Sequence, residues 1–424
     1  MSLHGTPVLV ACPDARPPAY QAVVGLAHAG LLGGFLTGYF NRGPSPFDGV
    51  LRRLSPAWFE RWDRLRQRRS EPGIPGARVR SAWSYDLALR LEGRLADRSN
   101  HARRELASWR TRRFDRTLTR TLRRDRPAAA LVFSDVGSGF ALPFCKREGI
   151  PYVLSMVHGD VREERAVLER EEQAAPEFFS LYLGQGSLDR EELGWLHDRR
   201  LRELELADRV LVPSDHTAAT IVGYGVNAAR VDVIPYAADT RRFRPDPSKR
   251  HGEGCTFLFA GGISQRKGVG YLLRAWQRVR RPGWRLQLLG ALPRDPGPLE
   301  PLLDGVALLG RVAHAEVPAR MAAADVFVFP SLFEGSAVVT YEALACGLPG
   351  IVTPAAGSVL RDGVEGFVVP PADVESLAAA MERLGADPEL RAGQSGAARR
   401  RAEAYDWPRY HAAIAAAVRE ALCA

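Results

Sequence analysis

Long uninterrupted apolar runs are missing from this chain of 424 residues. No segment reaches the roughly 18 apolar residues that a membrane-spanning helix needs. The most apolar stretch near the start, residues 25–40, carries His28 and five glycines, and we expect it to form a buried helix and a loop. The first residues also lack a basic region followed by an apolar block and a cleavage site. The sequence therefore predicts no signal peptide.

Cysteine is scarce, and acidic and histidine motifs for metals are missing. The five cysteines are scattered, odd in number and never in C-x-x-C spacing, which argues against a disulfide framework or a zinc site. The nine histidines follow no ligand-like spacing, and no Asp-x-Asp occurs. We expect reduced thiols, no metal and a cytoplasmic protein.

Lysine occurs only three times, so arginine carries the net charge of +9. Residues 51–126 hold 22 Arg against nine Asp and Glu, and the runs at 61–69 and 111–125 have apolar residues spaced for amphipathic helices. Three interpretations stay open: nucleic acid, an anionic membrane surface or lipid-linked substrate, and a plainly solvated face. No nucleic-acid module accompanies the charge and aromatic residues do not alternate with the arginines, so we expect no nucleic-acid partner. Peripheral contact at the inner face of a membrane remains an alternative.

Short β-branched or aromatic runs alternate with longer helical patterns along the chain. Such alternation is typical of an α/β protein with parallel sheets, whose strands are buried on both faces and read as continuous apolar runs. A first set of strands is predicted at 7–12, 130–134, 151–157, 209–214 and 231–236, and a second set at 255–260, 285–290, 305–310, 325–331 and 350–354.

The two sets are separated by residues 241–254, which are rich in Pro, Gly and charge and poor in apolar residues. We interpret this stretch as a linker between two domains, as the chain length also suggests. The expected domains are 1–240 and 250–405. A final helix is predicted from about Pro408 to the end, 408–424.

Residues 257–273 read FLFAGGISQRKGVGYLL and place two cations, Arg266 and Lys267, in a glycine-bracketed loop between a strand and a helix. Glycines such as Gly261 and Gly262 let backbone N–H groups approach an anion, and the positive end of the following helix points to the same place. Arginine binds phosphate oxygens as a fork, and lysine adds a mobile charge. The spacing matches neither the P-loop nor the dinucleotide fingerprint. From this loop alone, a purely structural turn, in which the glycines allow the tight bend and no anion binds, is an equally good interpretation.

A second element, residues 330–353, contains Glu334 and Glu342 separated by seven residues. The predicted strand ends just before Glu334, so this carboxylate is expected at the carboxyl edge of the sheet, where open parallel sheets bind ligands. A carboxylate there could hold sugar hydroxyls and another could hold a ribose diol. Glutamate pairs on helices more often face solvent.

The helix that carries Glu342 is predicted over 337–346. We expect Ser336 to cap its start and Gly347 to end it. The N–H groups of Ser336, Ala337 and Val338 would then be free to bind phosphate.

The segments AGGxxxRKGxxxLLxA (260–275) and ADVxVxPSxxEG(x)6EAxAxGxP (324–349) together resemble the retaining glycosyltransferases of the E-x7-E group, glycosyltransferase family 4, which have the GT-B fold. Their joint occurrence in this order is far more specific than either motif. The resemblance is strong over about 205–405 and thin over 1–200. Supporting matches occur at 209–214, 233–243 and 362–373.

This resemblance implies two facing Rossmann-like domains with a C-terminal crossover helix, in which the C-terminal domain binds the nucleotide sugar and the N-terminal domain the acceptor. Arg266 and Lys267 would bind the donor diphosphate and stabilise the leaving nucleoside diphosphate. Glu334 would hold donor-sugar hydroxyls and Glu342 the ribose. Further donor contacts are implied for Arg311 and Val312, beside the base.

On the acceptor side, His158 follows a strand end and resembles the family's histidine near the donor sugar and the acceptor, with Asp160 close behind it. Asp135 and Gly137 follow another strand end and are expected to line the acceptor site. A lone histidine is more often structural.

No cofactor and no metal are implied, because the two cations take the charge of the leaving group. Retention in the family is usually explained by a front-face displacement without an enzyme nucleophile. Two segments depart from the family pattern: 11–21 has prolines where a glycine-rich loop is usual, and 357–363 lacks the usual glutamate. The base, sugar and acceptor therefore stay open.

The resemblance predicts a retaining transferase that moves a sugar from a nucleoside diphosphate sugar to an acceptor hydroxyl, in the synthesis of a cell-surface polysaccharide, glycolipid or other glycoconjugate. A sugar-nucleotide epimerase of the same architecture is one alternative. A non-catalytic protein that binds a nucleotide sugar or a nucleic acid is another. The two glutamates together with the Arg–Lys pair favour the transferase.

Overall fold

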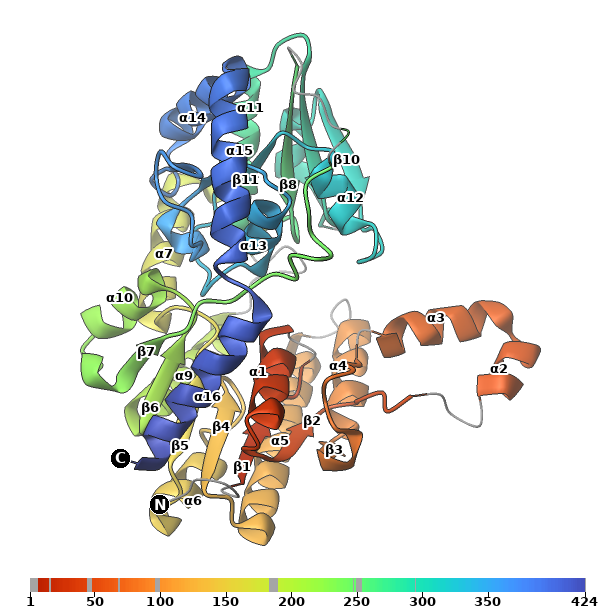
Figure 1. Ribbon diagram of the computed structural model, residues 1–424, viewed down its shortest axis with the longest axis vertical. Coiled ribbons are helices and arrows are strands. Elements are labelled where there is room, and N and C mark those ends of the chain that lie inside the picture. The colour runs from red at the N-terminus through yellow and green to blue at the C-terminus, as the bar shows by residue number, and fades with distance from the viewer. Residues whose placement is uncertain are drawn as a thin grey trace. The chain divides into compact units, whose positions relative to one another are not determined.

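A computed structural model describes residues 7–423, apart from 15–16, 44–47, 68, 96–99, 183–189, 247, 249–253 and 294. It contains two separate parallel sheets with helices packed around them, which confirms the predicted α/β class (Figure 1). By their contacts the residues divide into two compact units. Unit 1 comprises Met1–Ser155, Gly194–Leu211 and His411–Ala424, and unit 2 comprises Met156–Leu193 and Val212–Tyr410.

The first sheet has seven strands in the order β3-β2-β1-β4-β5-β6-β7. The pairings of β1 with β2 and β4, and of β4 with β5, are parallel. Chain order therefore reverses between β1 and β4. The strands are β1 Val8–Ala11, β2 Leu32–Thr37, β3 Val79–Ser81, β4 Ala129–Phe133, β5 Tyr152–Ser155, β6 Arg209–Val212 and β7 Val231–Val233.

The second sheet has six strands in the order β10-β9-β8-β11-β12-β13, and chain order reverses between β8 and β11. Its central strands are almost wholly apolar and buried, as expected where helices cover both faces. The Phe259 and Phe329 rings stack with centroids 5.6 Å apart across β8 and β11. The strands are β8 Cys255–Ala260, β9 Trp284–Leu289, β10 Val306–Gly310, β11 Val326–Phe329, β12 Gly350–Val352 and β13 Gly366–Val368.

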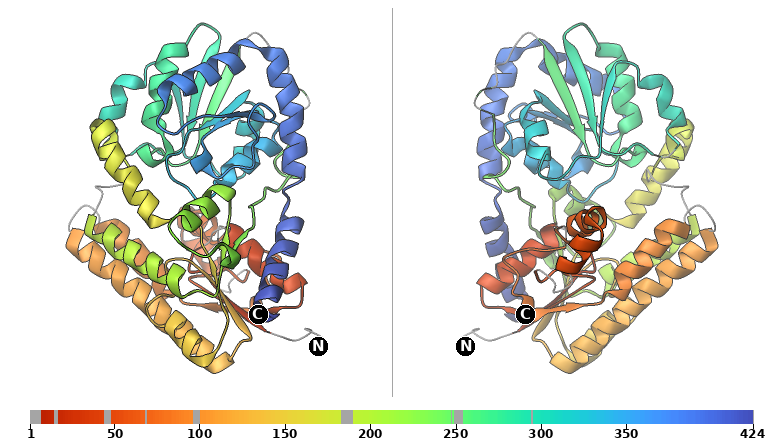
Figure 2. Two further views of the ribbon diagram at one scale, coloured as in Figure 1. Left: turned by 90° about the vertical axis from the view of Figure 1, so that its left-hand side faces the viewer. Right: turned by 90° about the vertical axis from the view of Figure 1, so that its right-hand side faces the viewer.

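Helices cover both faces of the first sheet: α1 and α16 lie on one face, and α5, α6 and α9 on the other (Figure 2). No described helix is long and apolar enough to cross a membrane. The helices up to α9 are α1 Pro17–His28, α2 Asp48–Leu54, α3 Pro56–Gln67, α4 Ser84–Leu95, α5 Asn100–Asp125, α6 Ala141–Glu148, α7 Val161–Ala174, α8 Pro176–Phe179 and α9 Arg190–Leu206. The later ones are α10 Asp215–Gly223, α11 Val269–Val279, α12 Val317–Ala322, α13 Val338–Ala345, α14 Val374–Ala386, α15 Pro388–Glu403 and α16 Trp407–Cys423.

All ten predicted strands are present. Residues 61–67 of the first basic run fall on α3 and the run 111–125 falls on α5, as the spacing predicted. The prediction for 25–40 was wrong in part. Its first residues complete α1, but Leu32–Thr37 form β2 rather than a loop. A Cβ on Gly33 would lie 2.6 Å from the Cβ of Pro7, so the glycine that suggested a loop permits close packing beside β1 instead.

The contact units differ from the domains expected from the sequence. The described residues of 156–193 and 212–240, which the sequence analysis assigned to the N-terminal domain, pack in unit 2, as do the described residues of the expected linker 241–254. The predicted final helix is present as α16. From His411 onward it packs in unit 1 against α1, where a Cβ on Gly25 would lie 2.7 Å from the His411 Cα.

Candidate functional site: a paired-cation loop at the switch point of unit 2

The topology of the second sheet brings the two sequence motifs together. From β8 the chain moves outward to β9 and β10, whereas from β11 it moves the opposite way to β12 and β13. The loops that leave β8 and β11 therefore diverge, and ligands bind in the crevice beyond the carboxyl ends of strands at such a switch point. These loops are 261–268 and 330–337, the two segments that the sequence analysis singled out.

The loop after β8 forms one tight turn before the next helix. Gln265–Lys267 make a 3-10 turn, and Gly268 ends it in the left-handed conformation with φ 71°. The helix α11 then starts directly, so the predicted order of strand, glycine loop and helix is confirmed. A Cβ on Gly268 would lie 2.0 Å from the Pro330 carbonyl oxygen, which means that the two loops touch at this residue.

Replacing Gly268 with alanine is expected to destabilise the protein by roughly 2–4 kcal/mol. The added Cβ meets both an unfavourable φ and the backbone of the neighbouring loop. Gly393→Ala, inside α15 with nothing within 4 Å of its added Cβ, should instead be neutral or slightly stabilising. Urea unfolding measures both. Equal stability of the two variants would show that Gly268 is not needed here.

Glu334 lies between the two cations of the loop. Its Oε1 is 2.9 Å from the Lys267 Nζ and 3.4 Å from an Arg266 guanidinium nitrogen. Arg266 also donates to the carbonyl of Phe333 at 3.1 Å, and the Lys267 ammonium lies 4.8 Å from the ring centre of Phe329. Three ionisable groups from the two loops thus form one cluster.

Burial by itself would raise the pKa of Glu334, but the positive charges of Arg266 and Lys267 outweigh it and lower the pKa below its usual value. The carboxylate is therefore ionised at neutral pH. Arg266 and Lys267 thus supply two positive charges beside Glu334, and the buried Glu164 of α7 is also close enough to act on its pKa. Arg266 retains 28% and Lys267 18% of its side-chain exposure, so an anion can still reach them.

The backbone around Glu334 is held by groups from other parts of unit 2. The carbonyl oxygen of Gly335 accepts hydrogen bonds from the Ser214 Oγ at 2.6 Å and the Thr217 Oγ1 at 2.8 Å. A Cβ on Gly335 would lie 2.2 Å from the Val157 carbonyl oxygen and 2.8 Å from the His158 nitrogen. The structure thus places His158 directly beside the Glu334 loop.

His158 is buried, and its Nδ1 lies 3.1 Å from the carbonyl oxygen of Gly159. The segment that carries it follows β5, and a Cβ on Gly159 would lie 3.0 Å from the Phe333 ring. Of the four residues predicted to carry the chemistry, Arg266, Lys267 and Glu334 share one cluster, and His158 adjoins it through the backbone.

The predicted cap of α13 was wrong. The Ser336 Oγ donates to the carbonyl of Gly357 at 2.7 Å and lies 3.1 Å from the Tyr341 hydroxyl, so it binds no amide of the helix. The N–H of Ala337 is also taken, by the Ala356 carbonyl at 3.0 Å. The helix start therefore offers at most the amides of Ser336 and Val338 rather than three.

Glu342 lies in α13, half-buried, and its carboxylate accepts no hydrogen bond from the described part of the chain. Burial raises its pKa to about 7, and the nearby charge of Arg242 offsets this only in part. A half-buried carboxylate without partners is costly unless a ligand supplies hydroxyl donors. The environment of Glu342 thus fits a hydroxyl-binding group.

Glu342→Gln is expected to raise the melting temperature at pH 8 and to change it little at pH 5. Because the pKa is raised on folding, the folded protein binds an extra proton below pH 7, and that stabilisation is lost as the pH rises through 7. The gain at pH 8 should be about 1–3 kcal/mol, since each pKa unit corresponds to about 1.4 kcal/mol. Thermal unfolding at both pH values measures it. Glu316→Gln, an exposed position, serves as the control, and equal gains for Glu342→Gln at both pH values would contradict the assignment.

The sequence analysis did not identify the groups outside the two motifs that support the cation loop, Glu171 and the carbonyl of Tyr182. The buried Glu171 of α7 accepts hydrogen bonds from the Gln265 Nε2 and the Tyr271 hydroxyl, both at 2.7 Å. The N–H of Arg266 donates to the carbonyl of Tyr182 at 3.1 Å. The sequence of α7 is strongly charged, which is typical of a solvent-exposed helix. Nothing in that pattern indicates that Glu171 is buried.

Of the other donor contacts predicted from the resemblance, Gly261 lies beside Lys267, where an added Cβ would meet the Lys267 side chain at 3.5 Å. Gly261 adopts φ 152° and donates its N–H to the Leu289 carbonyl, whereas a Cβ on Gly262 would meet open space. Arg311 and Val312 follow β10, and the exposed Arg311 makes no hydrogen bond or ion pair with the described residues.

The residues predicted for the acceptor have structural partners of their own. The Asp160 carboxylate is wholly buried, caps α7 and pairs with the Arg162 guanidinium at 2.7 Å. In unit 1, Asp135 pairs with Arg200 at 2.7 Å. A Cβ on Gly137 would lie 2.0 Å from the Tyr152 hydroxyl, so this glycine is needed for packing. Their acceptor role stays a prediction.

Two family models of known proteins together match most of the chain. The family model described as Glycosyltransferase Family 4 matches residues 79–242, and the one described as Glycosyl transferases group 1 matches residues 254–387. D-inositol 3-phosphate glycosyltransferase of Pseudarthrobacter chlorophenolicus is 32% identical over 63% of this chain. MMP alpha-(1->4)-mannosyltransferase of Mycolicibacterium hassiacum is 29% identical over 61% of this chain. These alignments cover 66% and 62% of the two relatives, less than two thirds of their own length.

Solved structures share the whole fold at low sequence identity. Sucrose-phosphate synthase from Thermosynechococcus elongatus superposes with a TM-score of 0.65 at 18% identity, over 98% of both chains. The Anabaena protein HepE, solved in complex with UDP and glucose, superposes with a TM-score of 0.62 at 16% identity, over 98% of this chain and 100% of its own.

Two parallel sheets of seven and six strands, each with a switch point, together with the Arg–Lys loop and the paired glutamates, define a protein of the GT-B class. The chain belongs to the group 1 glycosyltransferases, glycosyltransferase family 4.

Proposed function

We propose that this protein is a retaining glycosyltransferase that moves a sugar from a nucleoside diphosphate sugar to an acceptor hydroxyl without a metal ion. The observation that carries the proposal is the cluster of Arg266, Lys267 and Glu334 at the switch point of unit 2. HepE, of the same fold, was solved with UDP-glucose, which supports a nucleotide-sugar donor. The excess of arginine over acidic residues within 51–126 favours a lipid-linked acceptor.

The proposed chemistry assigns the charge changes to these residues. The bond between the sugar C1 and the diphosphate oxygen breaks, and Arg266 and Lys267 stabilise the negative charge that develops on the leaving diphosphate. The acceptor oxygen attacks C1 from the same face, and its proton passes to an oxygen of the departing phosphate. Glu334 holds the sugar hydroxyls, Glu342 holds the ribose, and His158 lies beside the donor sugar.

The two cations supply the positive charge that a divalent metal provides in other phosphate chemistry. Turnover should therefore be the same with a chelator and with added Mg²⁺ or Mn²⁺. Loss of activity in the chelator, restored by the metal, would overturn this part of the proposal and leave the transfer itself intact.

A panel of sugar nucleotides tests the function as a whole. Nucleoside diphosphate release should depend on both the sugar nucleotide and a hydroxyl acceptor, and the product should keep the anomeric configuration of the donor by NMR. Conversion of the donor sugar without any acceptor would instead support the epimerase alternative. An inverted product would refute retention.

A further inference from the structure

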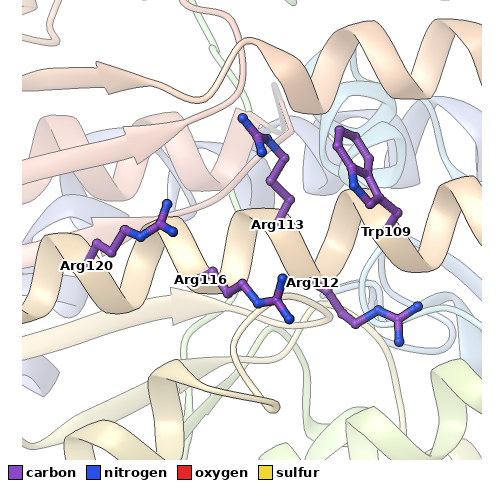
Figure 3. Close-up of a pocket in the computed structure, with 5 residues that line it drawn as sticks. All are labelled: Trp109, Arg112, Arg113, Arg116 and Arg120. Carbon is purple, nitrogen blue, oxygen red and sulfur yellow. The ribbon is translucent and has the colours of Figure 1, made fainter.

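One face of α5 has no part in the proposed transfer chemistry. Trp109, Arg112, Arg113, Arg116 and Arg120 line a hollow of about 280 Å³ and project from one run of the helix (Figure 3). Their spacing places them on one side of the helix, along roughly 16 Å at 1.5 Å per residue. We name these five residues the α5 arginine surface.

The charges of this surface are not neutralised within the described residues. Arg112 and Arg120 make no hydrogen bond or ion pair there. Arg116 contacts only the exposed ring of Phe140, 5.0 Å from its centre, and such a contact leaves the positive charge in place. Three guanidinium groups therefore face outward without a carboxylate.

The acidic residues of α5 lie away from these arginines. Asp115 is wholly buried and accepts hydrogen bonds from backbone amides at the start of α6. Asp125, at the far end of the helix, pairs with Arg80 and Arg124. Glu105 is exposed, one turn beyond Trp109. The stretch from Arg112 to Arg120 thus presents positive charge alone.

Aromatic side chains border the same surface. The Arg113 guanidinium lies 5.4 Å from the ring centre of Trp109, which is 46% exposed. The Arg113 Nε also donates to the Ser84 Oγ at 3.2 Å, and the preceding Trp83 is 65% exposed. Exposed tryptophan beside cations is typical of a surface that sits at the boundary of a lipid bilayer, because the indole is apolar with one polar edge.

The exposed apolar side chains gather in the same part of the sequence. Of the fourteen large apolar side chains that are most exposed among the described residues, nine lie between residues 50 and 140. They include Leu87 and Leu91, one turn apart on α4, which packs against α5. A face that serves only solubility would not combine a charge excess with exposed leucine and tryptophan.

We propose that the α5 arginine surface docks unit 1 on a membrane that carries anionic phospholipids. Arginine pairs with lipid phosphates in a fork, while Trp109 and Trp83 enter the headgroup region. A nucleic acid would also attract the charge, but the exposed Leu87 and Leu91 of the adjoining α4 favour an apolar bilayer boundary over a solvated polyanion. The occupant argued from this face is therefore the lipid surface.

Sedimentation with vesicles tests the proposal on the full chain. The protein should bind vesicles of phosphatidylglycerol and phosphatidylcholine at low salt and dissociate from them at high salt. It should not bind vesicles of pure phosphatidylcholine. The variant R112Q/R116Q/R120Q should bind about a hundredfold more weakly, since each basic residue near an anionic surface contributes a factor of roughly five. Trp109→Ala should weaken binding and reduce fluorescence quenching by brominated lipid.

A matched control removes the same charge elsewhere. R285Q/R320Q/R419Q replaces three exposed arginines of β9, α12 and α16, and should bind vesicles nearly as the wild type does. Both triple variants should unfold at the wild-type temperature. Equal vesicle binding by the two would overturn the proposal. So would displacement by soluble glycerol phosphate, which would indicate a headgroup pocket, or tight nucleic-acid binding at physiological salt with no vesicle binding.

Discussion

Lys267→Ala and Arg266→Ala are each expected to lower kcat by about a hundred- to a thousandfold. In the proposed mechanism each cation donates to an oxygen on which negative charge grows in the transition state, and loss of one such donor typically has an effect of this size. The Lys267 Nζ lies 2.9 Å and an Arg266 guanidinium nitrogen 3.4 Å from the Glu334 Oε1, so the contact with Glu334 holds both cations at one place. The measurement is nucleoside diphosphate release at saturating donor.

The control for this prediction is Lys146→Ala. Lys146 also pairs with a carboxylate, that of Asp208, but the pair is exposed in unit 1. Exposed ion pairs of this kind contribute little to stability, and turnover should not change. Kinetics within a factor of three of the wild type for Lys267→Ala, in a protein that still melts as the wild type does, would remove the cation loop from the mechanism.

Glu334→Gln and Glu342→Gln are expected to change the affinity for the nucleoside diphosphate in opposite directions. Glu334→Gln should lower kcat/KM for the sugar nucleotide by about ten- to a hundredfold, as for a lost hydrogen bond to a charged group. Its affinity for the nucleoside diphosphate alone should rise, because the variant removes the negative charge that lies between Arg266 and Lys267. Glu342→Gln should lower the affinity for the nucleoside diphosphate and the affinity for the sugar nucleotide by the same factor.

Calorimetric titration with the nucleoside diphosphate, beside kinetics with the sugar nucleotide, separates the two glutamates. Asp304→Asn, at an exposed carboxylate paired with Arg280, is the control and should change neither quantity. A loss of diphosphate affinity in Glu334→Gln, with none in Glu342→Gln, would mean that the two assignments are exchanged.

The sequence predicted the cation loop and the Glu334 loop well because each lies directly after a buried strand. An apolar run followed by glycine or proline marks a strand end, and the strand order then places the ends of β8 and β11 side by side. The sequence also predicted ten of the strands and missed β2, β3 and β13. At β2, glycines that allow close packing beside Pro7 suggested a loop.

What the sequence could not show are contacts between distant segments. Ser336 has the right residue type for a helix cap, but the Gly357 carbonyl, 21 residues further on, takes its hydroxyl. Glu171 looks like any solvated glutamate, and only the fold brings it to Gln265, 94 residues away. Local patterns hold no information on such competition.

The support of the cation loop by α7 and Tyr182 limits how the protein can be recombined with relatives. A chimera that exchanged only residues 250–405 would transplant Arg266 and Lys267 without Glu171 and the Tyr182 carbonyl. The incoming loop would then have to match a foreign helix. A chimera designed to exchange donor specificity should therefore follow the boundaries of the contact units and replace residues 156–193 together with residues 212–410.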